Sequence, residues 1–175
     1  KTNTKQGISL LNSDSPLTIT LEKEDSVKAS TEIIKVKKEA GAGKEKTILF
    51  LGDSLINENI YTNCVKELFE NDDMNINLIG TRGTEENKHE GRGGWSAYDY
   101  CNEQTKYGFT NPFLNNGKFD FGYYMKSNNY ADVDYVIISL GVNDLNIVGH
   151  NSHNEIIGYF NTIFDSIHQY NADIK

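Results

Sequence analysis

Short apolar runs that end in glycine are the feature that most constrains the fold of this chain. The runs TILFLG (residues 47–52) and VDYVIISLG (residues 133–141) carry apolar side chains on both faces. A strand of this kind is usually buried inside a parallel sheet, because helices cover both of its faces. Each run is followed by a segment in which apolar residues have helical spacing. The alternation of strands and helices therefore predicts an α/β fold with a parallel sheet.

A shorter apolar run and two helical patterns complete this alternation. The run MNINLIG at 74–80 predicts a further strand, and a doubly wound sheet would place the three strands in the order second, first, third. After the first strand, apolar residues at helical spacing form one stripe, namely Ile56, Ile60, Cys64 and Leu68. The helix after the last strand is expected to begin at a capping box of Ser152 and Glu155. Its apolar face consists of Ile156, Phe160, Ile163, Phe164 and Ile167.

The first part of the chain differs in character from the rest. The segments LTITLE (17–22) and STEIIKVKKE (30–39) alternate polar and apolar residues, which is typical of half-exposed antiparallel strands. The stretch AGAGKEK that follows has the composition of a connector. We therefore expect a β-rich extension, or the end of an accessory domain, at residues 1–45 and the main domain at residues 46–175. Within the main domain, residues 105–130 show little periodicity and are expected to form irregular surface structure.

Composition excludes several classes of protein. The formal net charge of -8 argues against nucleic acid as a partner, because such a partner requires a basic face. No apolar run approaches the roughly 18 residues of a membrane-spanning helix. Cys64 and Cys101 are too few and too far apart for a zinc site, and a disulfide between them is possible but not implied. We expect Cys64 to be a small buried thiol, and we expect no metal. The chain starts without Met or a signal-peptide pattern, so no compartment is indicated.

Three loops that leave the carboxyl ends of predicted strands carry residues suited to chemistry. After the first strand, Ser54 would expose its hydroxyl at the start of a helix, where its N–H favours an oxyanion, or would simply cap that helix. The glycines of HEGRGGW allow a backbone N–H to point into a site, or form a flexible turn. After the last strand, the amide of Asn143 could donate to an oxyanion or stabilise the turn with Asp144. Three such signals in this order favour a catalytic site.

Three sequence blocks carry a resemblance to a known family. FLGDSL, EGRGGW and SLGVND resemble the first three blocks of the SGNH hydrolases, the GDSL esterases and lipases, over about residues 46–145. The resemblance implies a three-layer α/β/α sandwich with a parallel, flavodoxin-like sheet. It also implies that Ser54 is the nucleophile of a serine esterase without metal or cofactor. The N–H of Ser54, the N–H of Gly94 and the side chain of Asn143 would then form the oxyanion hole.

The form of the second block bears on the substrate. HEGRGGW looks most like the carbohydrate esterases that remove acetyl groups, which implies a short acyl ester, an O-acetyl carbohydrate, as substrate. A secreted or cell-surface location would suit that substrate. The residues expected to contact the substrate are Asp53, His89, Trp95 and Asp144.

The fourth block of the family, Asp-x-x-His, has no clear counterpart. Asp165 and His168 form the string DSIH, but they fall within a strong helical period, where a solvated pair is the expected arrangement. We therefore expect the C-terminal part of the domain, with the catalytic Asp and His, to lie beyond Lys175. The 175-residue chain alone would then be inactive. It would associate through the uncovered edge of its last strand or with the missing part.

Two alternatives remain open from the sequence. The first is a carbohydrate-binding or structural module that keeps the fold without catalysis. Aromatic residues expected to be exposed would then stack on sugars, namely Trp95, Tyr98, Tyr100, Tyr107, Tyr123 and Tyr124. The second is a lipase or thioesterase on the same scaffold.

Overall fold

The structure is a computed structural model that describes residues 17–23, 27–33, 40–146 and 152–175. The chain divides into two compact units, Lys1–Ala40 and Gly41–Lys175. The first unit contains an antiparallel hairpin of β1 (Leu17–Lys23) and β2 (Val27–Ile33). Residues 34–39, which belong to a predicted strand, lie outside the described residues.

The second unit is built on a mixed sheet around β3 (Glu45–Gly52). On one side of β3 lies the parallel strand β11 (Tyr135–Ser139). On the other side, β4 (Asn75–Ile79) pairs with the first half of β3 and β6 (Lys88–Gly91) pairs with its end, both in parallel. The two-residue strand β5 (Arg82–Gly83) is antiparallel to β6. The predicted strand order, second, first, third, is confirmed.

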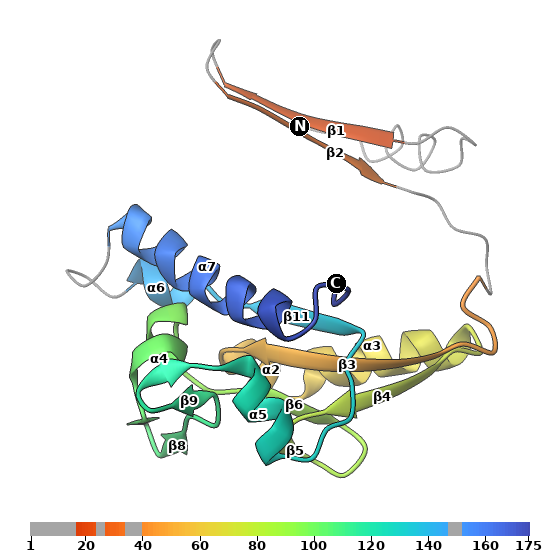
Figure 1. Ribbon diagram of the computed structural model, residues 1–175. Helices are drawn as coiled ribbons and strands as arrows, with labels where there is room; N and C mark the ends of the chain where they lie inside the picture. The colour runs from red at the N-terminus through yellow and green to blue at the C-terminus, as the bar shows by residue number, and fades with distance from the viewer. Residues whose placement is uncertain (1–16, 24–26, 34–39, 147–151) are drawn as a thin grey trace. The chain divides into compact units, whose positions relative to one another are not determined.

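Helices cover both faces of this sheet (Figure 1). One face is covered by the short α2 (Ser54–Asn57) and by α3 (Ile60–Asn71). The other is covered by α4 (Ala97–Asn102), α5 (Phe121–Ser127) and α7 (His153–Tyr170). The unit is therefore an α/β fold with a mixed sheet.

The remaining elements are short. α6 (Val142–Asn146) follows β11 directly. Two small hairpins, β7 (Thr105–Lys106) with β8 (Phe109–Thr110) and β9 (Leu114–Asn115) with β10 (Lys118–Phe119), connect α4 to α5. The capping box predicted for the last helix is confirmed, since the Ser152 side chain and Glu155 bond reciprocally at the start of α7.

The face under α4, α5 and α7 holds the larger cluster of buried side chains, which we call the aromatic core. It includes Trp95, Tyr100, Phe113, Phe119, Phe121 and Tyr124. Phe113 lies at its centre, with ring centroids 4.2 Å from Tyr124 and 5.0 Å from Phe119. Residues 105–130 thus supply much of the core, and their expected irregular surface structure is wrong. Two-residue strands leave no periodicity to detect, so the burial comes from the hairpins and α5.

The face under α3 holds a smaller cluster, the α3 core, formed by Ile48, Phe50, Ile56, Ile76 and Leu78. Of the predicted stripe, Ile56 is buried, but the three residues on α3 are not: Ile60 is 69% exposed, Leu68 is 67% exposed and Cys64 is exposed. Asn59 lies between α2 and α3 with a φ of 64°, which ends one helix before the next begins. This break changes the helical phase, so that Val65 and Phe69 pack on the sheet instead. The expectation of a buried Cys64 is wrong.

The outer edge of β11 carries a short interaction with the last residue. The Val136 N–H donates to the carbonyl of Lys175 at 2.9 Å, and the Lys175 N–H donates to the carbonyl of Asp134 at 3.0 Å. Among the described strands, none pairs with this edge of β11, and these two bonds are its backbone contacts. The side chains of Val136, Ile137 and Ile138 are half-buried, although the sequence suits a strand with a neighbour on each side.

Candidate active site

The turn after β3 presents Ser54 to solvent. Asp53 caps α2, since its carboxylate accepts a hydrogen bond from the Leu55 N–H at 3.0 Å. The Asp53 N–H donates to the carbonyl of Ser139 at 3.2 Å, which ties this turn to the end of β11. Ser54 is the first residue of α2 and is exposed. Its N–H has no acceptor among the described residues, as is usual for the first N–H of a helix.

Two glycines allow α2 to sit directly on the sheet. A Cβ on Gly52 would lie 2.4 Å from Cγ1 of Ile56, and a Cβ on Gly91 would lie 2.4 Å from the backbone N of Asn57. Gly52 and Gly91 face each other across β3 and β6. Any larger side chain at either position would push α2, and Ser54 with it, away from the sheet.

The second loop, after β6, makes a tight turn. The Trp95 N–H donates to the carbonyl of Arg92 at 3.2 Å, and Gly94, the third residue of the turn, has a φ of +75°. That φ favours glycine, and a Cβ here would also lie 2.9 Å from the ring of Tyr107. The Arg92 N–H donates to the carbonyl of Gly52 at 2.9 Å, which places the loop beside the Ser54 turn. The N–H of Gly94 has no acceptor within the described residues.

The third loop brings Asn143 to the second. Asn143 is the second residue of α6. Its Nδ2 donates to the carbonyl of Trp95 at 2.8 Å. An amide carries two N–H groups, so one remains to donate elsewhere. The three predicted oxyanion donors therefore come from three loops that are linked by hydrogen bonds at the carboxyl end of the sheet.

Asp144 fixes the second and third loops to each other. It is 2% exposed, and its carboxylate accepts from the Ala97 N–H at 3.0 Å and the Tyr98 N–H at 3.3 Å, at the start of α4. The partial positive charge of a helix N-terminus favours such a carboxylate. Asp53 and Asp144 are both buried, and each carboxylate binds backbone N–H groups at the start of a helix, Asp53 as the N-cap of α2 and Asp144 from a different loop, in place of the expected substrate contacts.

A buried polar network, which the sequence analysis did not predict, lies next to the loops of the site. Glu90 is 0% exposed and pairs with Arg92, which is 2% exposed, at 2.7 Å. The Tyr124 hydroxyl also donates to Glu90, at 2.9 Å. The Tyr100 hydroxyl donates to the carbonyl of Gly52 at 2.8 Å, and burial raises the pKa of Tyr100 well above its usual value. The sequence signal for this pair is the opposite charge of Glu90 and Arg92 on the two sides of Gly91, at the end of a short strand.

His89 is buried on the α3 side. It is 1% exposed, its Nδ1 accepts from the Gly91 N–H at 2.9 Å, and its Nε2 lies 2.9 Å from Oδ1 of Asn59. Burial, followed by the nearby Arg82, Arg92 and Lys88, lowers the pKa of His89 to about 4. The imidazole is therefore neutral near pH 7, with Nε2 donating to Asn59. The expected contact of His89 with a substrate is contradicted by this burial.

Half of the six aromatic residues expected to be exposed are buried. Trp95, Tyr100 and Tyr124 are 0% exposed, so the expectation that they are exposed for stacking on sugars is wrong. For Trp95, burial also contradicts the expected substrate contact, because its indole N–H donates to the carbonyl of Lys106 at 3.1 Å. Two other residues of this group are exposed as expected, Tyr107 at 71% and Tyr123 at 42%, and Tyr98 is half-buried. The ring of Tyr107 lies against Gly94.

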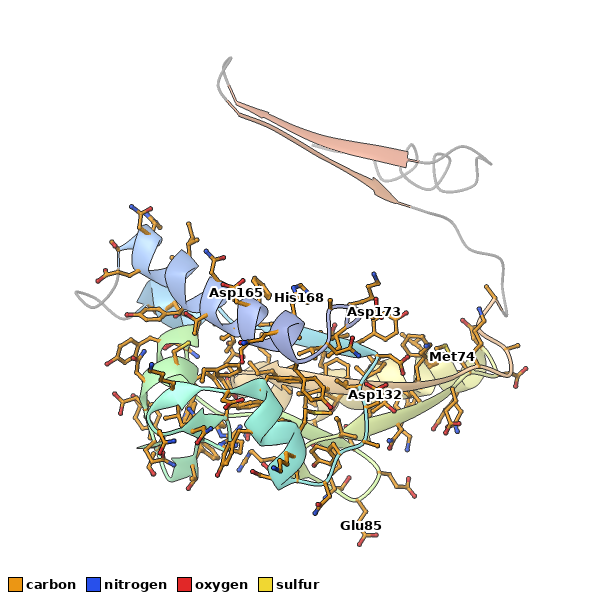
Figure 2. The ribbon with its side chains drawn as sticks, viewed as in Figure 1. Met74, Glu85, Asp132, Asp165, His168 and Asp173 are labelled. Atoms are coloured by element: carbon orange, nitrogen blue, oxygen red, sulfur yellow. The ribbon has the colours of Figure 1, made fainter. Side chains whose placement is uncertain are left out.

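Asp165 and His168 do not lie beside Ser54. Both are exposed on α7, and His168 is in its last turn (Figure 2). α7 is followed within a few residues by Lys175, which pairs at the start of β11, whereas Ser54 lies at the carboxyl end of the sheet. No described histidine makes a hydrogen bond to Ser54, and His150 lies outside the described residues.

A cavity opens next to the Ser54 turn. Its volume is about 580 Å³, and its lining consists of Leu55, Ile56, Glu58, Ile60, Tyr61, Cys64 and Ser139. Apolar side chains predominate in this lining. A helix long and apolar enough to cross a membrane is not found in the described segments, nor is a group of three or more His, Cys, Asp or Glu suited to a metal ion.

Comparison with known proteins gives one distant likeness. No known protein family matches the chain, and neither does any curated protein. Among solved structures, the chain is similar to the crystal structure of a possible lipase from Chitinophaga pinensis DSM 2588, with 19% sequence identity and a TM-score of 0.39. The likeness covers 74% of this chain and 46% of that chain, so the chain spans less than half its length. A likeness at this level does not establish a shared activity.

Proposed function

We propose that this chain carries the nucleophile and the oxyanion hole of a serine carboxylic-ester hydrolase with an SGNH-type three-layer sandwich. The observation that carries the proposal is the meeting of three loops at one end of the sheet. The Arg92 N–H bonds to Gly52 beside Ser54, and Asn143 bonds to Trp95 beside Gly94. Two backbone N–H groups without described acceptors and one amide N–H are thereby available to a developing oxyanion.

The reaction would follow the usual course of serine acyl transfer. Oγ of Ser54 attacks the ester carbonyl carbon, and its proton passes to a base. The resulting oxyanion accepts from the N–H of Ser54, the N–H of Gly94 and the side chain of Asn143. The C–O bond then breaks, the alcohol leaves with the proton, and water hydrolyses the acyl-enzyme in a second, equivalent sequence.

No described histidine makes a hydrogen bond to Ser54. His89 is buried and bonded elsewhere, His168 lies in the last turn of α7, and His153 is the exposed first residue of the same helix. A serine enzyme without its base loses on the order of 10⁶ in kcat. We therefore propose that the chain acts slowly by itself and needs an imidazole from outside the described residues.

For the alcohol part of the substrate we propose a carbohydrate. Support comes from Tyr107, whose ring is 71% exposed and lies against Gly94. An aromatic ring beside the oxyanion donors would suit the apolar face of a sugar. The same ring favours the second candidate function, a non-catalytic carbohydrate-binding module.

Acylation of Ser54 separates these functions. The chain is mixed with p-nitrophenyl acetate, with and without added imidazole as a substitute for the base, and the acetylated protein is detected by mass. We expect imidazole to accelerate acetylation of Ser54, Ser54→Ala to remove it, and Asn143→Ala to slow it roughly 10²–10³-fold. His168→Ala is the control and should have no effect. Equal acetylation of the wild type and Ser54→Ala would show that Ser54 is not the nucleophile.

A further inference from the structure

The cavity beside Ser54 is lined by large apolar side chains that a soluble helix would ordinarily bury. Leu55 is 64% exposed, Ile60 is 69% exposed and Tyr61 is 48% exposed. Single exposed apolar side chains are common on protein surfaces, whereas a group of them around one cavity is typical of a binding site. The volume of this cavity, about 580 Å³, lies in the range of small-molecule binding sites.

The cavity lies next to the proposed site of reaction. Leu55 directly follows Ser54 in α2, and Ser139, another lining residue, accepts the N–H of Asp53 through its carbonyl. Ile60 and Cys64, one helical turn apart on α3, also line the cavity. An ester held at Ser54 could therefore extend one of its two substituents into it.

The lining selects an uncharged, apolar group. Its one charged residue is the acidic Glu58, and the rest of the lining is mainly apolar, with hydroxyl groups on Tyr61 and Ser139 and the thiol of Cys64. A sugar would find few hydrogen-bonding partners there, and a free carboxylate would be repelled by Glu58. An acyl chain meets neither penalty. Hydrolysis would release the acyl group as a carboxylate, so the product would bind to the cavity more weakly than the ester.

We propose that this cavity binds the acyl chain of the ester substrate, and that the chain is longer than acetyl. The proposal rests on the proposed function of Ser54 and replaces the expected acetyl group with a medium-length, apolar acyl group. Burial of each additional methylene in such a cavity is expected to raise kcat/KM about fourfold until the cavity is full.

Cys64 offers a test that does not depend on catalysis. Its exposed thiol lines the cavity, and Cys101 is buried elsewhere. The rate of Cys64 alkylation by iodoacetamide is measured in Ser54→Ala with 2-decanone, an uncharged mimic of a long acyl group, and with 2-butanone as the short control. We expect 2-decanone to slow alkylation several-fold and 2-butanone to leave it unchanged. Equal rates with both ketones, or protection that depends on protein concentration, as expected from a second copy on this face, would overturn the proposal.

A second test uses acylation and a matched pair of variants. The rates of Ser54 acylation by p-nitrophenyl acetate, butyrate and octanoate are compared in the presence of imidazole. Ile60→Gln and Leu68→Gln change α3 residues of similar exposure, 69% and 67%, but Leu68 is outside the cavity lining. We expect the wild type and Leu68→Gln to prefer octanoate and Ile60→Gln to lose that preference. The same preference in both variants would overturn the proposal. Protection of Cys64 without any acylation of Ser54 would support the cavity and reject the proposed function.

Discussion

The two faces of the central sheet differ in how completely they are covered. On one face, the aromatic core buries Trp95, Phe113 and Tyr124 without any exposed surface. On the other face, α2 and α3 cover a smaller cluster, and α3 leaves Ile60 and Leu68 in solvent. The comparison indicates that packing stability is concentrated on the first face, whereas apolar surface that a ligand can reach lies on the second.

Strand β6 shows the same contrast in its charged and polar residues. Glu90 points to the aromatic core and keeps its partner Arg92 at 2.7 Å. The adjacent His89 points to the opposite face and bonds to Asn59. Successive residues of a strand face opposite sides, so one short strand places an ion pair on one face and a neutral imidazole on the other.

The two cysteines give the largest expected difference between the faces. Cys101 belongs to the aromatic core, and burial, with a smaller contribution from Asp144, raises the pKa of its thiol to about 12. Cys64 is exposed on α3. We expect iodoacetamide to alkylate Cys64 at least about 10³-fold faster, because Cys101 reacts only after the core opens. Peptide mapping of timed samples measures both rates; comparable rates would mean that α4 is not held on the core.

Truncation of the central ring of the aromatic core should strongly destabilise the protein. Phe113→Ala removes the contacts with Tyr124 and Phe119 and leaves a cavity. We expect the free energy of unfolding to fall by about 3–5 kcal/mol. Urea denaturation of the wild type and the variant measures this. A loss below about 1 kcal/mol would contradict the assignment of stability to this face.

Acid should weaken the protein through His89 on the opposite face. The pKa of His89 is about 4 in the folded chain, whereas it is about 6.5 in an unfolded chain. The unfolded state therefore takes up a proton first as the pH falls. The contribution of His89 to the free energy of unfolding is therefore constant above about pH 6.5. It decreases between about pH 6.5 and about pH 4, by up to about 3 kcal/mol in total.

The matched variant for this prediction is His89→Gln, which cannot take up the proton. Urea denaturation of both proteins at pH 7, 5.5 and 4 should show a smaller pH dependence in the variant. If the two proteins lose stability in parallel, the imidazole is already accessible to protons in the folded state.

Polar substitutions on the exposed side of α3 should have the smallest effect. Leu68 is 67% exposed, so Leu68→Gln should change the free energy of unfolding by no more than about 0.5 kcal/mol. Thermal denaturation of the variant beside the wild type measures this. A loss of 2 kcal/mol or more would indicate that another surface covers α3 in solution.

The sequence predicts the frame of the fold better than its packing. Runs of residues that are apolar on both faces located β3 and β11 and their order, because burial on both sides leaves a pattern that is visible locally. The α3 stripe was wrong because a single residue, Asn59, takes a positive φ and resets the helical phase. The burial of Phe113 could not be predicted, since it depends on two-residue strands that bring distant aromatic rings together.

The candidate site shows the same division. The loops of Ser54, Gly94 and Asn143 are predicted from the sequence because each follows a recognisable strand or block. Their surroundings are not, since the buried Glu90–Arg92 pair and the inward orientation of His89 depend on which face of β6 each residue occupies. A charged residue or a histidine near a glycine-rich loop looks the same in sequence whether it meets a ligand or the protein interior.

The bonds that join the second and third loops do not pass through Ser54. Asp144 binds the start of α4, and Asn143 binds the carbonyl of Trp95. The spacing between Gly94 and Asn143 is therefore set without the hydroxyl of Ser54. In the proposed enzyme, a variant without that hydroxyl would keep an intact receptor for negatively charged oxygen, so that recognition of the substrate and its conversion could be lost one at a time.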